Sequence, residues 1–267
     1  MSDDTLSGCV AIVTGGGGTI GAATAAALLD AGAAVTITSR DADRLHGIVK
    51  LLGGSDTPVL AVPADVTDPD EFDAVVERTL DAYGRIDVLV NLAGTVAPIG
   101  VPAWDITPDE WRRALDVNLT GAFLTTRAVV PVMLCQGMGR ILHLSSGAAH
   151  TPLAGASAYG AAKAAVNQYV RALATELDGT GVTVIAFNPG PADGPALREV
   201  RSALFPQRLA WPGPLSRRNA AEAARFIVGL SSASSARHNG EFLSWRDPPR
   251  DALGRARHAV GSSAADG

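Results

Sequence analysis

The amino-acid sequence predicts an α/β protein with a doubly wound parallel sheet of about seven strands and helices on both faces. The first observation is that short, nearly uninterrupted apolar runs recur along the chain, at residues 9–14, 34–39, 58–63, 86–91, 140–145, 182–187 and 240–244. Such strands are buried on both faces, which is typical of parallel sheets. The second observation is that helical patterns separate these runs, at residues 20–31, 41–52, 68–83, 108–134, 158–178 and 219–230. Strands and helices that alternate in this way form doubly wound domains.

We expect a single domain over residues 1–247, followed by a flexible tail over residues 248–267. A chain of 267 residues lies within the single-domain range of α/β folds, and it contains no internal repeat. The tail lacks an apolar face. Residues 191–216 interrupt the regular pattern with five prolines, Pro191, Pro195, Pro206, Pro212 and Pro214. Long proline-rich loops are often functional, so this segment is predicted to be a substrate lid.

The composition argues against several classes of protein. The net charge is −5 with no block of basic residues, which disfavours nucleic acid as a partner. Cys9 and Cys135 lack the spacing of metal ligands, so we expect reduced thiols, no metal site and a cytoplasmic protein. The acidic, polar start is unlike a secretory signal, and we expect no apolar stretch long enough to span a bilayer. A membrane partner is therefore not expected.

A glycine-rich segment, "VTGGGGTIGAATAAAL", connects the first strand to the first helix. A flexible linker would not lie between a buried strand and an alanine-rich helix. Small residues at this position let the backbone approach a pyrophosphate, which the free N–H groups of the helix N-terminus attract. Gly15 makes the turn, and Gly21 permits close packing of the helix on the strand. The segment therefore predicts dinucleotide binding.

A second pattern places Tyr159 four residues before Lys163, one of only two lysines in the chain. At about 3.6 residues per helical turn, the two side chains project from one face. Taken alone, the stretch also fits an ordinary amphipathic helix whose lysine reaches water. A tyrosine hydroxyl beside an ammonium group would instead suit acid–base chemistry.

These patterns belong to a larger set with a fixed order and spacing. Its members are "TGGGGTIG" (14–21), "NLAG" (91–94), Asn118 in "DVNLTG", Ser146 thirteen residues before Tyr159, "YGAAK" (159–163) and "NPGP" (188–191). Over roughly residues 7–245, the set resembles a classical short-chain dehydrogenase/reductase. The family signatures are Thr-Gly-x-x-x-Gly-x-Gly, Asn-Asn-Ala-Gly and Tyr-x-x-x-Lys. The resemblance implies a Rossmann fold and hydride transfer between a nicotinamide cofactor and a carbonyl or secondary alcohol.

The resemblance also implies four catalytic residues. Tyr159 would be the general acid in carbonyl reduction, or the base in the reverse reaction. An isolated tyrosine has a pKa of ~10, and the ammonium of Lys163 is expected to lower it while also donating to the nicotinamide ribose. Ser146 would hold the substrate oxygen where charge develops. Asn118 would hold a water in a proton relay, which explains an asparagine in a helix.

The cofactor contacts implied by the family fall on seventeen positions: Gly15, Gly17, Gly18, Thr19, Ile20, Gly21, Ser39, Arg40, Asp65, Val66, Asn91, Ala93, Gly94, Tyr159, Lys163, Pro189 and Gly190. The second strand ends with Ser39 and Arg40, where an NAD enzyme usually has a carboxylate that binds the adenosine ribose. Arg40 could pair with a 2′-phosphate, so we predict NADP(H) over NAD(H). Asp41 or Asp43 could take the ribose instead, although Asp41 is better suited to the N-terminus of the next helix.

Several residues depart from the family pattern or have weaker assignments. Thr19 replaces a glycine, Leu92 replaces the second asparagine, Gly194 replaces a threonine near the nicotinamide amide, and "SWRD" (244–247) replaces Val-Asp-Gly-Gly. Asp65 is expected to contact the adenine or cap a helix. His150 is expected to be a solvated loop residue, and His143 a packed strand residue.

The sequence thus predicts an NADP(H)-dependent oxidoreductase for a small, largely apolar, cyclic ketone or alcohol. The apolar side chains expected at the substrate are Ile99, Trp104, Leu197, Leu204, Phe205, Leu209 and Trp211. One alternative is a ketoreductase of carrier-bound ketoacyl or polyketide groups, although "ELDGTG" (176–181) lacks a cation for an acidic carrier. Another is a non-catalytic dinucleotide-binding redox sensor, which would not need Ser146, Tyr159 and Lys163 together. The family implies a homodimer or homotetramer through helices 108–134 and 158–178.

Overall fold

The structure, a computed structural model of the chain, describes residues 6–192, 194–204 and 220–246. Its core is a seven-stranded parallel sheet in the order β3-β2-β1-β4-β5-β6-β7. The strands are β1 (Val10–Thr14), β2 (Ala34–Thr38), β3 (Val59–Ala61), β4 (Val88–Asn91), β5 (Gly139–Leu144), β6 (Val182–Asn188) and β7 (Phe242–Ser244). Each strand lies in one of the predicted apolar runs or extends it by a residue. The predicted fold class is confirmed.

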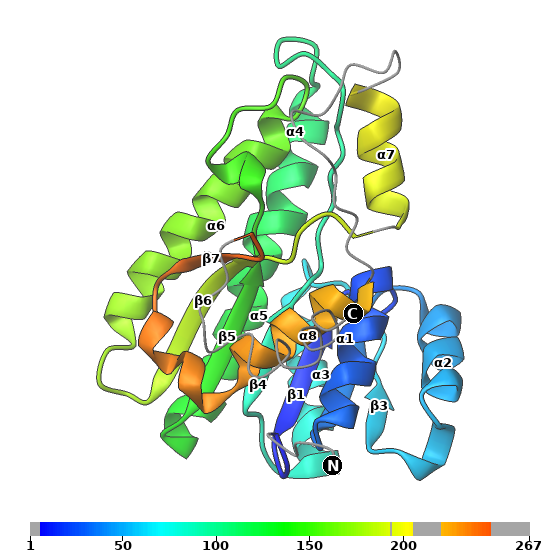
Figure 1. The fold of residues 1–267 in the computed structure, drawn as a ribbon, viewed down its shortest axis with the longest axis vertical. Coiled ribbons are helices and arrows are strands. Elements are labelled where there is room, and N and C mark those ends of the chain that lie inside the picture. The colour runs from blue at the N-terminus through cyan, green and yellow to red at the C-terminus, as the bar shows by residue number, and fades with distance from the viewer. Residues whose placement is uncertain (1–5, 193, 205–219, 247–267) are drawn as a thin grey trace, which may run out of the picture.

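Helices cover both faces of the sheet (Figure 1). One apolar cluster joins the sheet to α1 (Thr19–Asp30), α2 (Ala42–Leu51) and α8 (Ala220–Ser231). A second cluster joins the opposite face to α3 (Pro69–Tyr83), α5 (Gly121–Gln136) and α6 (Ser157–Glu176). Neighbouring residues of β1 show the division, because Val13 belongs to the first cluster and Ile12 to the second. Short 3-10 turns complete the described chain: η1 (Gly54–Asp56), η3 (Gly147–Ala149) and η4 (Ala233–His238).

The helix predicted over residues 108–134 consists of three parts. Helix α4 (Pro108–Leu115) begins with a capping box between Thr107 and Glu110, a π-helical turn η2 (Asp116–Thr120) follows, and α5 continues the helix. By length and composition alone, Pro108–Gln136 could cross a membrane, contrary to the sequence expectation. Its α5 part packs on α3 and the sheet, which explains the apolar composition. Local π-helical turns are frequently found at functional sites.

The prediction of a loop over residues 191–216 is wrong in part, because Pro195–Leu204 form helix α7. Proline is accommodated at the first position of a helix, where its missing N–H is not needed. Figure 1 shows α7 standing beyond the end of the sheet. The remaining lid residues predicted at the substrate, Phe205, Leu209 and Trp211, lie outside the described residues, as does the tail over 248–267.

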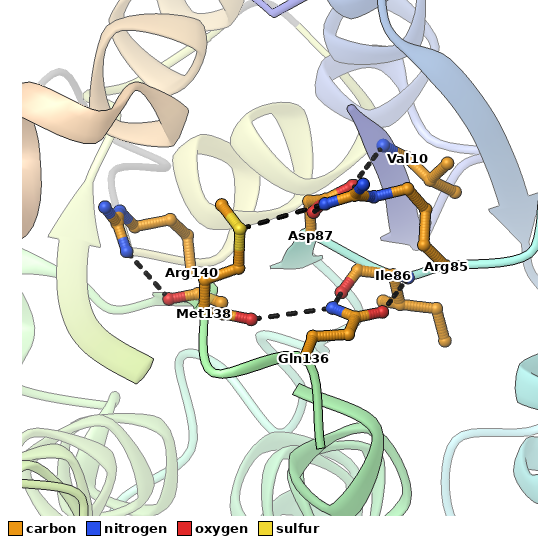
Figure 2. A network of polar contacts seen from close by, with 8 residues as sticks. Val10, Arg85, Ile86, Asp87, Gln136, Met138 and Arg140 are labelled. Carbon is orange, nitrogen blue, oxygen red and sulfur yellow. Dashed lines mark hydrogen bonds and ion pairs between the residues drawn. The ribbon is translucent and has the colours of Figure 1, made fainter. Parts of the chain in front are cut away.

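The amino ends of β1, β4 and β5 are joined by a polar network around the buried Asp87 (Figure 2). Its carboxylate accepts hydrogen bonds from the Val10 amide at 2.9 Å and from the guanidinium of Arg85 at 2.6 and 2.8 Å. The side chain of Gln136 pairs with both backbone groups of Ile86, at 2.7 and 3.0 Å. These contacts satisfy backbone groups at the amino ends of the strands. Ligands bind in such sheets at the opposite edge, where the strands have their carboxyl ends.

Candidate active site

A cavity of about 1010 Å³ opens at the carboxyl ends of the central strands. Segments far apart in the sequence meet there: the glycine-rich loop after β1, the loop after β4, the loop between β5 and α6, the loop after β6, α7 and the end of β7. Among the predicted site residues, the lining includes Gly15, Gly18, Thr19, Ile20, Gly21, Gly94, Asn118, Ser146, Tyr159, Lys163, Pro189 and Gly190. The fold therefore brings the predicted catalytic residues and most predicted cofactor contacts to one cavity.

The glycine-rich loop forms a close-fitting turn under the start of α1. Gly15 has a φ of +66°, and a Cβ atom there would lie 3.0 Å from the Ala93 amide nitrogen. A Cβ atom on Gly21 would collide with the carbonyl oxygen of Gly15, so both positions require glycine. Helix α1 begins at Thr19 with Gly18 as its N-cap, and no side chain caps its first amides. The exposed Gly18 and the uncapped first amides of α1 fit the pyrophosphate of a dinucleotide.

Lys163 is placed one helical turn after Tyr159 on α6, as the spacing predicts. Its side chain is 1% exposed, and Nζ donates a 2.9 Å hydrogen bond to the Leu144 carbonyl oxygen at the end of β5. Nζ also lies 5.8 Å from the centre of the Tyr159 ring. The oxygen of Ser146 accepts from the Ala148 amide at 3.2 Å, so the Ser146 O–H remains able to donate.

Burial dominates the ionisation of this pair. It raises the pKa of the Tyr159 hydroxyl above its usual value, and a hydrogen bond with Ser146 lowers the pKa by less. Burial also lowers the pKa of Lys163 to about 7. The pKa of Tyr159 is therefore raised and not lowered as expected, because burial disfavours the charged phenolate. Tyr159 is a protonated donor near neutral pH, which suits a general acid.

Asn118 lies in the π-helical turn and braces the loop after β4. It is 2% exposed; its Oδ1 accepts from the Thr95 amide at 3.3 Å, and its Nδ2 donates to the carbonyl oxygens of Thr95 and Ala114 at 2.8 and 2.9 Å. A Cβ atom on Gly94 would lie 2.8 Å from this Oδ1 and 3.6 Å from Nζ of Lys163. Glycine at this position keeps Asn118 and Lys163 next to each other at the cavity wall.

Asn91, a predicted cofactor contact, lies behind the cavity wall in a buried network. Its Oδ1 accepts from the Thr14 hydroxyl at 2.7 Å, and its Nδ2 donates to Thr125 Oγ1 at 2.6 Å and to Nδ1 of His143 at 3.3 Å. Thr14 Oγ1 accepts in turn from the amides of Leu92 and Ala93, at 3.1 and 3.0 Å. Asn91 therefore supports the loop after β4 through Thr14.

His143 is a packed strand residue, as expected. Its Nε2 lies 3.1 Å from Thr126 Oγ1, which already donates to the Ala122 carbonyl oxygen at 2.8 Å. Because that hydroxyl has only one proton, His143 must donate from Nε2. Burial, aided by the charge of Lys163, lowers the pKa of His143 to about 3. The imidazole is therefore neutral at physiological pH.

At the adenosine end, Ser39 lies directly under the glycine-rich loop. A Cβ atom on Gly17 would be 2.9 Å from Ser39 Oγ, which is buried and has no hydrogen-bond partner in the described part of the chain. Arg40 forms a long ion pair with Asp65, with Nη1 3.9 Å from Oδ2. Both side chains lie in a smaller cleft of about 340 Å³.

The aspartates in question at this end have local structural roles. Asp41 caps α2, because its Oδ1 accepts from the Arg44 amide at 2.9 Å, which confirms the expected position. Asp65 caps a turn, because its Oδ1 accepts from the amide and hydroxyl of Thr67, at 2.9 and 2.7 Å. The N-cap of α3 is Asp68, so Asp65 does not start that helix.

Arg44 is a residue that the sequence reasoning missed. It lines the large cavity, and its Cδ would lie 3.5 Å from a Cβ atom on Gly17. Arg44 makes no ion pair with any residue in the described ranges. In the sequence, Arg44 stands out only as a second arginine four residues after Arg40. It reaches the cavity because α2 packs close to the glycine-rich loop.

The rest of the cavity wall is mainly apolar. It includes Val96, Ile99, Leu153, Leu197, Val200 and Phe242. Ile99 and Leu197 thus lie where the sequence predicts, whereas Trp104 is 86% exposed and lies off the cavity wall. Leu204 packs instead near Gly155, where a Cβ atom would be 3.0 Å from its Cδ2.

Two further side chains lie at the wall. His150 is exposed, as expected for a solvated loop residue, and it also lines the cavity. Its ring is tilted against that of Phe242 with the ring centres 4.5 Å apart, and its Nε2 lies 3.0 Å from Nδ2 of Asn167. Trp245, from the altered "SWRD" ending, packs on Gly190, where a Cβ atom would be 2.5 Å from its Nε1. Among the described residues, no group of three His, Cys, Asp or Glu side chains could hold a metal ion.

Comparison with known proteins agrees with this geometry. Residues 9–204 match the family described as short chain dehydrogenase. The chain is 36% identical over 189 residues to 1-deoxy-11-beta-hydroxypentalenate dehydrogenase of Streptomyces exfoliatus, covering 70% of this chain and 69% of that protein. It also resembles two solved structures. A single-substitution variant of actinorhodin polyketide ketoreductase with NADPH has a TM-score of 0.80 and 28% identity, covering 92% and 97% of the two chains. The 3-ketoacyl-(acyl-carrier-protein) reductase of Brucella melitensis with NADH has a TM-score of 0.80 and 29% identity, covering 92% and 99%.

The family match extends over most of the chain, and the cavity brings together the nucleotide-binding loop and the Ser146, Tyr159 and Lys163 side chains. The cofactor class is a nicotinamide dinucleotide, which the glycine-rich loop and the uncapped start of α1 fit. The chain belongs to the short-chain dehydrogenase/reductase family and is an oxidoreductase that acts on CH–OH groups.

Proposed function

We propose that this enzyme reduces the carbonyl group of a small, largely apolar ketone, or oxidises the corresponding alcohol, with NADP(H). The central observation is that Ser146, Tyr159 and Lys163 share one cavity with the glycine-rich loop, while the remaining wall is mainly apolar. A bound nicotinamide would supply or accept the hydride. The protein residues would bind the reacting oxygen and move its proton.

In the reducing direction, Tyr159 donates its proton to the substrate oxygen. Burial keeps this hydroxyl protonated near neutral pH, and a positioned acid of this kind contributes about 10²–10⁴-fold to the rate. The O–H of Ser146 stabilises negative charge on the same oxygen. Lys163 lies within reach to compensate the phenolate that remains, because its Nζ is 5.8 Å from the ring centre. Asn118 keeps the neighbouring loop in place and is proposed to hold the water that returns the proton.

The preference for NADP(H) is supported by two arginines that flank Ser39. Arg40 lies on the side of the smaller cleft, and Arg44 lies on the side of the large cavity. The carboxylates of Asp41 and Asp65 already accept local hydrogen bonds, at the start of α2 and in a turn, and so are less available to bind an adenosine ribose. A 2′-phosphate in this region would meet two guanidinium groups and the unpartnered hydroxyl of Ser39.

The apolar wall supports a substrate with a hydrocarbon skeleton, because apolar surface that leaves water there is stabilised by burial. The Streptomyces relative is named as a dehydrogenase of 1-deoxy-11-beta-hydroxypentalenate, which supports a hydroxyl or carbonyl group as the reacting group for this chain as well. The likeness to the polyketide ketoreductase and the ketoacyl reductase supports a second candidate, a carrier-bound ketoacyl substrate. The absence of cations in "ELDGTG" (176–181) favours the free ketone.

Turnover on matched substrates tests the proposal. Purified enzyme is assayed with NADPH against cyclic ketones, sugar phosphates and a ketoacyl group offered either as a small thioester or on its carrier protein. We expect the highest kcat/KM on the cyclic ketones, and a loss of most of this activity in Tyr159→Phe. A strong preference for the carrier-bound group would favour the second candidate. Binding of NADPH without turnover on any substrate would favour the redox sensor.

Two further properties are part of the proposal. We expect a homodimer or homotetramer, because α5 and α6 present small residues and exposed apolar side chains, including Phe123. We also expect a cytoplasmic enzyme, in keeping with the two free cysteines Cys9 and Cys135.

A further inference from the structure

Two residues at which the sequence departs from the family pattern lie next to each other in the folded chain. Thr19 starts α1, and Gly194 lies just before α7. A Cβ atom on Gly194 would lie 3.1 Å from Thr19 Oγ1 and 3.4 Å from Thr19 Cβ. Both residues line the large cavity. The two departures are therefore one local feature at the start of α1.

The constraint on the residue at position 194 comes from Thr19 and not from a left-handed backbone. Gly15 and Gly190 have positive φ values, +66° and +85°, whereas Gly194 does not lie in the left-handed region. Its φ therefore does not by itself call for glycine. A Cβ atom only 3.1 Å from the threonine oxygen is tighter than most real contacts, and a β-branched residue would add a further clash. Gly194 thus leaves space for the Thr19 side chain.

The Thr19 hydroxyl has no hydrogen-bond partner among the residues that the structure describes, although its side chain is only partly exposed. It lies at the N-terminus of a 12-residue helix whose N-cap, Gly18, provides no side-chain cap. A hydroxyl in this position adds a rotatable donor to the fixed N–H donors of the first helical turn. An anion at the helix N-terminus would be within the region served by both kinds of donor.

We propose that Thr19 is a cofactor-binding residue whose hydroxyl donates to a phosphate oxygen of the bound dinucleotide, and that Gly194 keeps the space this hydroxyl needs. The glycine that the family pattern expects at position 19 would provide only its amide. The inference rests on dinucleotide binding, but not on the preference for NADP(H), because both cofactors contain the pyrophosphate.

The first test removes the hydroxyl while keeping the shape. The dissociation constants of NADPH and NADH are measured by calorimetry for wild type, Thr19→Val and Thr19→Ser. A hydrogen bond to a charged group predicts that Thr19→Val weakens both cofactors about tenfold or more, while Thr19→Ser stays near wild type. Thr175→Val, on an exposed position of α6, is the matched control and should bind both cofactors normally. Equal affinities for wild type and Thr19→Val would overturn the proposed hydrogen bond.

The second test exchanges the two residues. Gly194→Thr should lower the melting temperature of the cofactor-free protein and weaken NADPH binding, because its side chain clashes with Thr19. Thr19→Gly combined with Gly194→Thr should recover the melting temperature, because the clash is removed. If the changes in melting temperature of the two single substitutions simply add in the double variant, Gly194 does not provide space for Thr19, and that part of the proposal is wrong. If wild type itself fails to bind either cofactor, the proposed function fails, which the control measurement distinguishes.

Discussion

Lys163 Nζ lies 5.8 Å from the centre of the Tyr159 ring and donates to the Leu144 carbonyl oxygen at 2.9 Å, so this ammonium group is held to the end of β5 beside the tyrosine. Lys163 is buried and Tyr159 is partly buried, and burial shifts both toward their neutral forms: the pKa of Tyr159 rises and that of Lys163 falls to about 7. The pair therefore combines a protonated acid with an ammonium group that changes charge near neutral pH.

Tyr159→Phe should remove most of the turnover and leave the dissociation constant of NADPH nearly unchanged. The substitution deletes the proton donor and keeps the ring, so kcat should fall by about 10²–10⁴-fold. Steady-state kinetics on an active ketone and calorimetric titration with NADPH measure the two quantities separately. A kcat close to that of wild type would contradict the assignment of Tyr159 as the acid.

Lys163→Met should stabilise the cofactor-free protein at neutral pH while reducing turnover. The pKa of Lys163 is about 7 in the folded protein and 10.5 in the reference state. Below pH 7, where the lysine is charged in both states, its burial therefore lowers the free energy of unfolding by roughly 5 kcal/mol. Between pH 7 and 10.5 the unfolded chain holds more protons, and the stability of wild type rises with pH. The gain in the free energy of unfolding from Lys163→Met should therefore be largest near pH 6 to 7. It should shrink toward pH 10, because wild type gains stability between its folded pKa of about 7 and the reference value of 10.5.

Urea denaturation across this pH range measures the difference. The variant also loses the hydrogen bond from Lys163 to the Leu144 carbonyl oxygen, which costs about 1–3 kcal/mol and reduces the net gain. Lys50→Met, at the exposed end of α2, is the control and should not change the pH dependence. A stability difference that is the same at every pH would show that burial of the ammonium is not its cause.

Much of this fold could be predicted from the sequence, because its signals are local. Nearly unbroken apolar runs such as Val10–Thr14 identify strands buried on both faces. Parallel strands in turn place the residues that follow them, including Ser146 after β5, at one edge of the sheet. The Tyr159 and Lys163 spacing is read directly from helix geometry.

What could not be predicted depends on contacts between distant segments. The π-helical turn at Asp116–Thr120 holds Asn118 against Thr95, a contact that no local pattern records. Arg44 reaches the cavity only because α2 packs beside the glycine-rich loop. The predicted lowering of the Tyr159 pKa was wrong for a similar reason. The spacing of Tyr159 and Lys163 indicates a nearby charge, but it does not show the burial that raises the pKa.

Phe123→Asp should weaken self-association if α5 forms the subunit contact. Phe123 is 46% exposed on α5, and its ring meets that of Tyr169 from α6 edge-on at 6.4 Å. A carboxylate buried in an apolar contact between subunits would be strongly unfavourable. Light scattering should show a dimer or tetramer for wild type and a smaller species for the variant. A monomeric wild type would contradict the predicted assembly, and an unchanged variant would place the contact elsewhere.

Substituting the two arginines beside Ser39 should reveal which one sets the cofactor preference. A 2′-phosphate is present in NADPH and absent from NADH, so loss of a charge-assisted hydrogen bond, roughly 1.5–3 kcal/mol, should reduce kcat/KM for NADPH by about tenfold to hundredfold. NADH should be little affected. Arg40 shares its charge with Asp65 across 3.9 Å, whereas Arg44 has no ion-pair partner among the described residues, so Arg44→Ala should cost more than Arg40→Ala. The ratio of kcat/KM for the two cofactors is compared in wild type and both variants, with Arg171→Ala on the exposed face of α6 as the control. A wild type that prefers NADH, or a ratio that survives both substitutions, would contradict the proposed phosphate contact.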